Sequence, residues 1–153
     1  MAPTVLVTGA TSGLGRHAAL ALARRGWRVF GVGRREASLA SLEAEGTGTG
    51  LEGFVLDVTS AGSVAAGRER ILERTEGYGL DALVNNAGYG LGGPVELLDL
   101  DELRAQFETN VVAPVALTQA FLPEMRARGA GRIVNISSVI GRIALPYMGA
   151  YCG

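Results

Sequence analysis

The chain has 153 residues, of which 48% are hydrophobic and 19% charged, so it can bury the core of one domain. Its 14 lysines and arginines nearly balance 15 aspartates and glutamates, and the formal net charge of −1 offers no basic field to nucleic acid or to an anionic membrane. Cys152 is the only cysteine, no apolar run approaches the roughly 18 residues of a spanning helix, and no secretory signal pattern is present, so we expect a cytoplasmic protein.

Apolar runs and helical segments alternate along the chain. Residues 4–7 predict a first strand that runs into a loop with three glycines, and the alanine-rich segment 16–25 predicts the first helix. Further strands are expected at 28–33, 53–57, 80–85 and 131–137. Further helices are expected at 35–45, from Thr59 or Ser60 to about 75, from Asp99 to about 128, and from Met148 onward.

The helix predicted from Asp99 contains two prolines. Pro114 and Pro123 each remove a backbone donor, so we expect this helix to bend or to unwind locally. Its apolar residues recur at helical spacing and predict one buried face, made of Leu103, Phe107, Val111, Leu117, Phe121 and Met125.

Strands that are joined by helices cannot pair as hairpins and require parallel pairing with right-handed crossovers. We therefore predict an α/β fold, a Rossmann-like doubly wound sheet of about five parallel strands in the order 3-2-1-4-5 with helices on both faces. Residues 1–153 would form a single domain, and a ligand crevice would lie at the carboxyl ends of the strands.

The first strand ends in a loop with the spacing Gly-x-x-x-Gly-x-Gly, which departs from the Gly-x-Gly-x-x-Gly dinucleotide pattern. A phosphate fits such a turn because the helix N-terminus offers unpaired N–H groups and glycine lets the anion approach. The alternative is a glycine-rich turn that merely packs tightly. The candidate cofactor-binding residues here are Thr8, Gly9, Ser12, Gly13, Leu14 and Gly15.

The second strand is followed by Arg34 and Arg35, with no acidic residue before Glu36. An acid in this place binds the ribose 2′-hydroxyl of NAD, whereas a basic residue accepts the 2′-phosphate of NADP. Two guanidiniums can make bidentate phosphate contacts, so we predict NADP(H), with NAD(H) less favoured. The alternative is a solvated helix start, which applies best to Arg35.

The third and fourth strands also end in candidate residues. Asp57 ends an apolar strand, where it could accept a hydrogen bond from the adenine amino group or could cap the following turn. After the fourth strand, the small residues Ala87 and Gly88 would admit a ligand, while Asn85 and Asn86 could tie together neighbouring strands.

Ser138 and Tyr151 form a hydroxyl pair that suits hydride chemistry on a carbonyl, if one oxygen binds the substrate and the other transfers a proton. Free tyrosine, with a pKa of about 10, is too weak an acid-base partner at pH 7 and needs a nearby cation. On a helix the natural place for that cation is four residues later. The sequence ends two residues after Tyr151, at Gly153.

These motifs, in this order and spacing, resemble the short-chain dehydrogenase/reductases over the chain from Thr4 to Gly153. The resemblance rests on the glycine loop at 8–15, on Asn85 to Gly88, on Asn110, on the segment 133–138, and on Tyr151 thirteen residues after Ser138. It implies that Ser138 holds the substrate oxygen and that Tyr151 is the general acid-base. It also implies that Asn110 helps to relay protons through a backbone bend and a bound water, that Asp57 and Val58 contact adenine, and that Asn86, Ala87 and Gly88 line the cofactor.

The chain departs from the family pattern at its C-terminus, where relatives complete Tyr-x-x-x-Lys and continue through further strands and loops. The resemblance therefore implies a domain that is incomplete at the C-terminus, and we expect the 153-residue polypeptide to be inactive by itself. Its fifth strand would be a sheet edge, and Ile133, Ile136, Ile140 and Ile143 would lack partners. Relatives usually associate through the long helix and the last one, so a full-length form is expected to be a homo-oligomer.

The function we predict is an NADP(H)-dependent oxidoreductase that interconverts a carbonyl and an alcohol on a small-molecule substrate, with no metal. The alternative is a non-catalytic dinucleotide-binding module, a sensor or scaffold of the same fold. A phosphate-site hydrolase is disfavoured because the glycine loop lacks the Gly-Lys-Ser/Thr ending.

Overall fold

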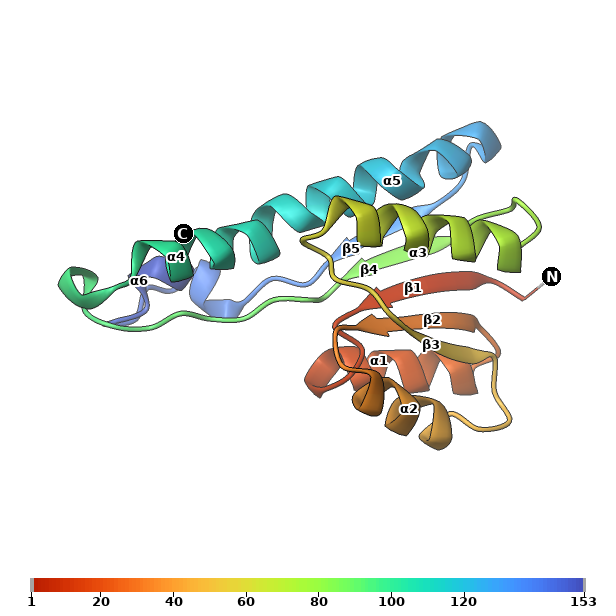
Figure 1. Ribbon diagram of the computed structural model, residues 1–153, viewed down its shortest axis with the longest axis horizontal. Helices are drawn as coiled ribbons and strands as arrows, with labels where there is room; N and C mark the ends of the chain where they lie inside the picture. Colours follow the sequence, from red (N-terminus) through yellow and green to blue (C-terminus); the bar gives the residue numbers. More distant parts are fainter. Residues whose placement is uncertain (1, 153) are drawn as a thin grey trace.

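The computed structural model describes residues 2–152 and has one five-stranded parallel sheet. Its strand order, β3-β2-β1-β4-β5, confirms the predicted order, with β1 and β4 at the point where the direction of winding changes (Figure 1). The strands are β1 (Thr4–Thr8), β2 (Arg28–Gly33), β3 (Leu51–Val55), β4 (Ala82–Asn85) and β5 (Arg132–Asn135).

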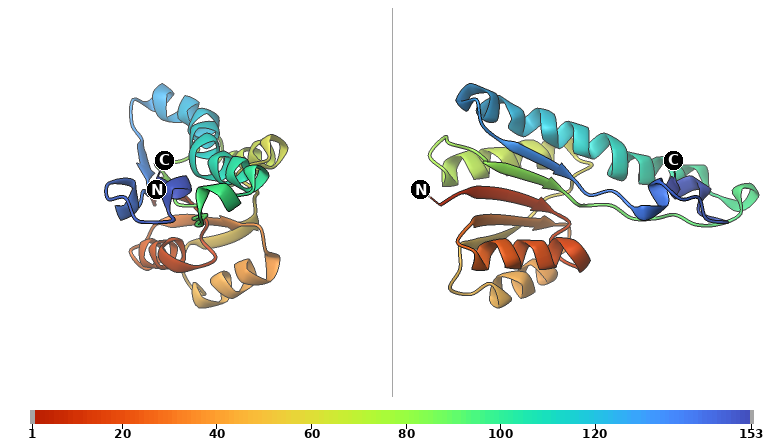
Figure 2. Two further views of the ribbon diagram at one scale, coloured as in Figure 1. Left: turned by 90° about the vertical axis from the view of Figure 1, so that its left-hand side faces the viewer. Right: turned by 180° about the vertical axis from the view of Figure 1, so that it is seen from behind.

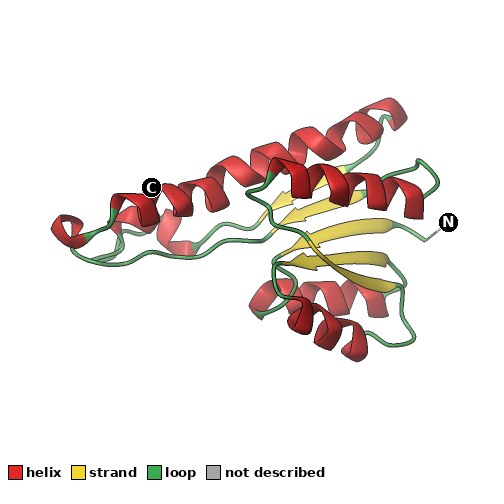
Figure 3. Cartoon of the chain, in the orientation of Figure 1, coloured by secondary structure: helices red, strands yellow, loops and turns green. Residues whose placement is uncertain are grey.

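Helices cover both faces of the sheet, as predicted. The helices α1 (Gly13–Arg24) and α2 (Glu36–Glu45) lie on one face, and α3 (Ala61–Arg74) and α5 (Ala113–Arg128) lie on the other (Figures 1 and 3). The start of α3 and the end of α5 each have a clear local cause. Ser60 accepts a hydrogen bond from the Ser63 amide at the start of α3, and Gly129, with φ +66°, ends α5 in the left-handed conformation.

The core is divided by the sheet into two apolar layers. Along β1, Leu6 belongs to the layer under α3 and α5, while Val5 and Val7 belong to the layer under α1 and α2. This alternation follows from the two-residue period of a strand. Every residue of β1 is buried, as a central parallel strand requires.

Three predicted strands had wrong boundaries, each by two residues: β3 at both ends, β4 at its start and β5 at its end. β3 begins at Leu51 and ends at Val55, because Leu51 already pairs with Val29 of β2. Asp57 therefore lies beyond the strand rather than at its last position. β4 begins at Ala82 and β5 ends at Asn135, so both are shorter than their apolar runs.

The helix predicted from Asp99 is three segments: α4 (Leu100–Phe107), a π-helical turn (Glu108–Val112) and α5. The widened turn ends two residues before Pro114, which cannot donate to a carbonyl of the preceding turn, so the expected local distortion is present there. At Pro123, by contrast, α5 continues without an interruption. The expectation of one buried face was wrong in part. Leu117, Phe121 and Met125 are buried against the sheet, but Phe107 and Val111 are exposed because α4 and the turn extend beyond it.

Two chain segments leave the carboxyl edge of the sheet side by side. They are residues 86–112, which include α4, and residues 136–152, which include α6 (Gly149–Cys152); together we call them the extension (Figure 2). Each contains one short 3-10 turn that the sequence did not indicate, at Val95–Leu97 and Val139–Gly141. Gln106 is the only buried residue among those of the extension that the structure describes.

β5 is an edge strand among the described residues, and its outer side is open. All four of its residues are exposed, as are Ile136 and Ile143 after it, which agrees with the expectation that these isoleucines lack partners. Ile140, which was expected to behave in the same way, is half-buried. An apolar edge of this kind is a ready template for another strand.

Asp81 ties the start of β1 to the segment before β4. Its carboxylate accepts hydrogen bonds from the Thr4 amide at 2.7 Å, from the Thr4 hydroxyl at 3.1 Å and from the Tyr78 hydroxyl at 2.6 Å. Partial burial acts to raise the pKa of Asp81, but these hydrogen bonds and the nearby Arg128 outweigh it and hold the pKa below its usual value. The same contact with Asp81 raises the pKa of Tyr78.

Replacing Asp81 by Asn should destabilise the fold by about 1–3 kcal/mol, because the amide keeps the shape but weakens three charge-assisted hydrogen bonds. The pKa of Asp81 is lower in the folded state than in the unfolded state. The carboxylate's contribution to the free energy of unfolding is therefore complete above about pH 4 and is lost as the pH falls through the folded-state pKa. Urea unfolding between pH 3 and 7 measures this. The D81N variant should show a smaller acid dependence than the parent, and equal dependence in both would contradict the assignment.

Candidate active site

The polar segments at the carboxyl ends of all five strands line one hollow of about 1480 Å³, which we call the carboxyl-end hollow. Most of the predicted site residues face it, including residues as distant in sequence as Ser12 and Tyr151. The predicted residues in its lining are Gly9, Ser12, Gly13, Leu14, Arg34, Arg35, Asp57, Val58, Asn86, Ala87, Gly88, Asn110, Ser138 and Tyr151.

The start of α1 presents uncapped backbone N–H groups to this hollow. Ser12 is at the N-cap, but its side chain makes no capping hydrogen bond, and no acidic residue lies in the first turn. Ser12, Gly13 and Leu14 are all exposed, and Gly13 adopts φ +53°, which glycine tolerates best. This end of α1 therefore has the geometry and the partial positive charge that bind an anion.

Thr8 and Gly15 are not in the lining of the hollow; they lie behind it and hold the glycine loop against the β4 loop. The Thr8 hydroxyl accepts hydrogen bonds from the amides of Asn86 at 3.0 Å and Ala87 at 2.9 Å, and the Asn86 side chain donates to the Thr8 carbonyl at 2.9 Å. A Cβ on Gly15 would lie 2.3 Å from the Asn86 side-chain nitrogen and 2.4 Å from the Gly9 carbonyl oxygen. Gly15 is thus a packing position between the two loops.

Arg34 and Arg35 both line the hollow and are exposed. No described residue makes a side-chain hydrogen bond or an ion pair with either guanidinium. Both charges are therefore available to an anionic group in the hollow.

Asp57 acts as a turn cap. Its Oδ1 accepts hydrogen bonds from the Thr59 amide at 2.9 Å and from the Thr59 hydroxyl at 2.7 Å. These two bonds, together with the charge of Arg34, lower the pKa of Asp57 against the opposing effect of partial burial. Of the two possibilities that the sequence left open, the turn cap is present in the structure.

A pair of asparagines joins β4 to β5 at the floor of the hollow. The Asn85 side chain donates to Oδ1 of Asn135 at 2.8 Å, while its own Oδ1 is buried and has no described hydrogen-bond partner. Sequence reasoning named Asn85 as a strand tie but missed Asn135, Thr11, Thr59 and Gln106, which also line the hollow. Their polarity was visible in the sequence, but only the folded arrangement brings them together.

Asn110 lies in the π-helical turn, and both polar atoms of its side chain bind the backbone of Tyr89. Its Oδ1 accepts from the Tyr89 amide at 3.1 Å and its Nδ2 donates to the Tyr89 carbonyl at 2.8 Å. The helix distortion that the resemblance implies at this position is therefore present, and the side chain holds the loop after β4.

Ser138 and Tyr151 come to the same hollow from the segment after β5. Ser138 precedes the Val139–Gly141 turn and its hydroxyl accepts weakly from the Ile140 amide, at 3.4 Å. Tyr151 is half-buried on α6, and its ring lies against Gly90, where a Cβ would be 3.2 Å from the ring. The two hydroxyl-bearing residues thus face the hollow near Asn110 and the β4 loop.

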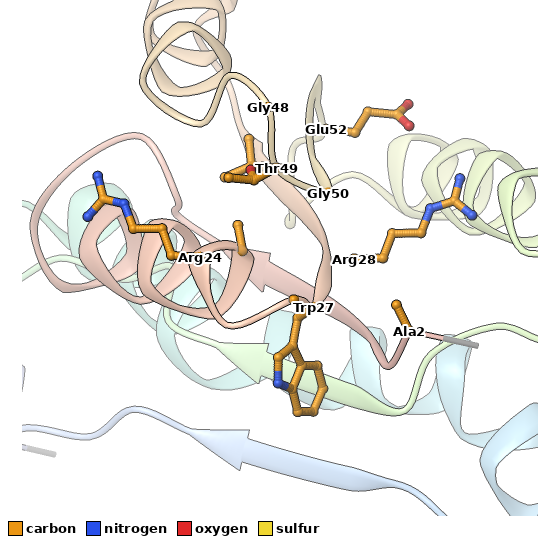
Figure 4. Close-up of a pocket in the computed structure, with 11 residues that line it drawn as sticks. Ala2, Arg24, Trp27, Arg28, Gly48, Thr49, Gly50 and Glu52 are labelled. Atoms are coloured by element: carbon orange, nitrogen blue, oxygen red, sulfur yellow. The ribbon is translucent and has the colours of Figure 1, made fainter.

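A second hollow, of about 670 Å³, lies around the start of β2 and β3 and contains none of the predicted site residues. Trp27, Thr49 and Glu52 contribute to its lining, and the side chains of Arg24 and Arg28 point away from each other (Figure 4). Two cations that diverge do not form an anion site, so the candidate catalytic and phosphate-binding residues all belong to the carboxyl-end hollow.

Residues 2–152 offer neither a metal site nor a membrane-spanning helix. No group of three histidine, cysteine, aspartate or glutamate side chains is placed to hold a metal ion. None of the helices in that part of the chain has the length and apolarity needed to cross a membrane.

A family model described as short chain dehydrogenase matches residues 3–153. The chain belongs to the short-chain dehydrogenase family. Human 17-beta-hydroxysteroid dehydrogenase type 1 is 42% identical to it over 159 residues, which cover 97% of this chain and 46% of the human protein.

Solved structures of family members have the same fold. A short-chain dehydrogenase from Streptomyces avermitilis superposes with a TM-score of 0.90 at 41% identity, covering 98% of this chain and 54% of the other. The F189W actinorhodin polyketide ketoreductase with NADPH superposes with a TM-score of 0.93 at 35% identity, covering 98% and 58%. The chain therefore spans about half the length of these family members.

Proposed function

We propose that this short-chain dehydrogenase chain carries the cofactor-binding and catalytic part of an NADP(H)-dependent oxidoreductase that interconverts a carbonyl and an alcohol. The observation that carries the proposal is the single hollow, which places an anion-binding helix start, two unpaired guanidiniums and the Ser138–Tyr151 pair around one space. A nicotinamide dinucleotide needs such a combination, a phosphate site at one end and proton-transferring groups at the other.

The residues present fit a dinucleotide. The uncapped N–H groups at Ser12 to Leu14 would hold the pyrophosphate, and the small residues Ala87 and Gly88 would leave room for the cofactor beside β4. The turn formed by Asp57 and Val58 lies along the same wall as Arg34 and would face the adenosine end.

The preference for NADP(H) is supported by Arg34. No described acidic side chain pairs with its guanidinium, and no carboxylate stands at the end of β2 to bind a ribose 2′-hydroxyl. A 2′-phosphate there would receive charge-assisted hydrogen bonds from Arg34, with Arg35 at the start of α2 adding to the positive field.

At the other end of the hollow, Ser138 would donate a hydrogen bond to the substrate oxygen and hold the carbonyl in place. Tyr151 would give its proton to that oxygen during reduction and take it back during oxidation. The bound cofactor supplies the hydride. Asn110 would contribute by fixing the Tyr89 backbone, which keeps the loop between cofactor and Tyr151 in position.

The first experiment is titration of the natural gene product, identified by its intact mass, with NADPH and with NADH. Tighter binding of NADPH, followed by NADPH oxidation in the presence of ketone substrates, supports the proposal. Cofactor binding without turnover of any carbonyl or alcohol would instead support a non-catalytic binding module, and no binding of either nucleotide would overturn both.

Replacing Arg34 by Ala should weaken NADPH binding by about 10- to 100-fold, the factor for loss of charge-assisted hydrogen bonds to a phosphate. NADH binding should change little, because NADH has no 2′-phosphate. Isothermal titration with both nucleotides measures the two effects. Arg25→Ala removes another exposed guanidinium, just after α1, and serves as the matched control. Equal loss of NADH and NADPH affinity in R34A would contradict the assignment.

A further inference from the structure

In the loop after β4, Gly88, Gly90 and Gly92 stand at alternate positions. A side chain from another segment of the site packs against each of these glycines. A Cβ on Gly88 would lie 3.1 Å from Oδ1 of Asn110, and one on Gly90 would lie 3.2 Å from the Tyr151 ring. A Cβ on Gly92 would lie 2.9 Å from the sulfur of Met148. Glycine at these positions therefore lets the α6 segment approach the loop closely. The backbone amides of the loop still need hydrogen-bond partners.

Gln106 on α4 connects this loop to α6. Its Oε1 accepts from the Leu91 amide at 2.6 Å, and its Nε2 donates to the Ala150 carbonyl at 2.6 Å. Ala150 immediately precedes Tyr151, so a single side chain spans from the loop to the backbone of the helix that carries the tyrosine. A glutamine suits this place because one amide offers an acceptor and a donor on neighbouring atoms.

The burial of Gln106 sets it apart from its surroundings. It is 2% exposed, and no other residue of the extension that the structure describes is buried. A buried amide that loses a partner bears a desolvation cost, so this position favours the arrangement in which both hydrogen bonds are made. Asn110, four residues later, binds Tyr89 in the same loop, so two amide side chains hold the loop at successive turns.

We propose that Gln106 is a positioning residue that fixes α6, and with it Tyr151, against the loop after β4. This role rests on the function proposed above, in which Tyr151 transfers the proton. Gln106 itself needs no contact with substrate. It sets the distance between the tyrosine and the remainder of the hollow, and in enzymes a displacement of about 1 Å can cost 100-fold in rate.

The test compares three variants of the natural gene product by hydrogen–deuterium exchange. Gln106→Leu removes both hydrogen bonds, and exchange should become about three- to tenfold faster in peptides covering 148–152 and 89–93, the factor for loss of one buried hydrogen bond. Gln106→Glu, as a carboxylate, still accepts from Leu91 but cannot donate to Ala150, so the increase should be larger at 148–152. Gln119→Leu makes the same substitution at an exposed position of α5, and the rate of hydrogen exchange should stay unchanged in both segments.

The second measurement separates positioning from general stability. In both Gln106 variants, assayed at a temperature at which each is fully folded, kcat for carbonyl reduction should fall by about 10- to 100-fold while the NADPH dissociation constant changes little. Unchanged exchange at 148–152, or a kcat equal to that of the parent, would overturn the role of Gln106. If the parent protein binds no nucleotide or reduces no carbonyl, the proposed function fails, and the exchange data still show whether Gln106 holds α6.

Discussion

Replacing Tyr151 by Phe is expected to lower kcat for carbonyl reduction in the natural gene product by about 10²–10⁴-fold, the usual contribution of a positioned acid-base group. The phenyl ring keeps the contact with Gly90, so the packing of α6 should survive and only the proton-transferring oxygen is removed. NADPH affinity should stay within about threefold of the parent value, because the phosphate-binding residues lie at the other end of the hollow. Steady-state kinetics and direct NADPH titration measure the two quantities.

Tyr147 provides the matched control for this change. It lies four residues before Tyr151, is 69% exposed and is not part of the carboxyl-end hollow. Tyr147→Phe should therefore leave kcat unchanged. A Tyr151→Phe variant with parental kcat, or a Tyr147→Phe variant that loses activity, would remove the basis for assigning proton transfer to Tyr151.

Replacing Gly15 by Ala is expected to cost about 1–3 kcal/mol of folding stability or more, the range for overpacking a close contact, and to weaken NADPH binding. The added methyl group would lie 2.4 Å from the Gly9 carbonyl oxygen, a backbone atom that cannot swing aside as a side chain can. The glycine loop would have to move, and with it the N–H groups proposed to hold the pyrophosphate. Urea unfolding and NADPH titration report the two consequences.

Gly62 is the control for the glycine substitution. It lies in the first turn of α3, has no positive φ, and a Cβ there would meet nothing within 4 Å. Gly62→Ala should be neutral or stabilising by up to about 1 kcal/mol, since alanine is the better helix former. If Gly15→Ala were as benign as Gly62→Ala, the tight packing between the glycine loop and the β4 loop would not exist in solution.

The sheet could be predicted because its signals are local. β1 and β2 are short apolar runs bounded by turn residues. Helical segments lie between the strands, and strands connected in this way pair in parallel. The boundaries of β3 could not be predicted in the same way. Leu51 and Glu52 join the strand because β2 offers them partners, and such pairing is a property of the neighbour rather than of the segment.

Several residues of the candidate site could be predicted because they follow the strand ends, whereas Gln106, which reaches the hollow from α4, was missed. Arg34, Asn86 and Ser138 all follow strands, and topology alone brings them together. Gln106 lies in the last turn of α4, and a polar residue on a helix normally indicates a solvated face. The same extension of α4 beyond the sheet leaves Phe107 exposed, although its spacing predicts a buried face.

The extension buries far fewer side chains than the sheet and its covering helices do. The start of α1, proposed to bind an anion, belongs to a helix that packs on the apolar layer under α1 and α2. By contrast, α6 and Tyr151 belong to the extension, where Gln106 is the only buried residue that the structure describes. Segments with few buried contacts open at a lower free energy than the domain as a whole. In the 153-residue polypeptide, mild denaturant should therefore open the segment that carries Tyr151 before the segment at the start of α1.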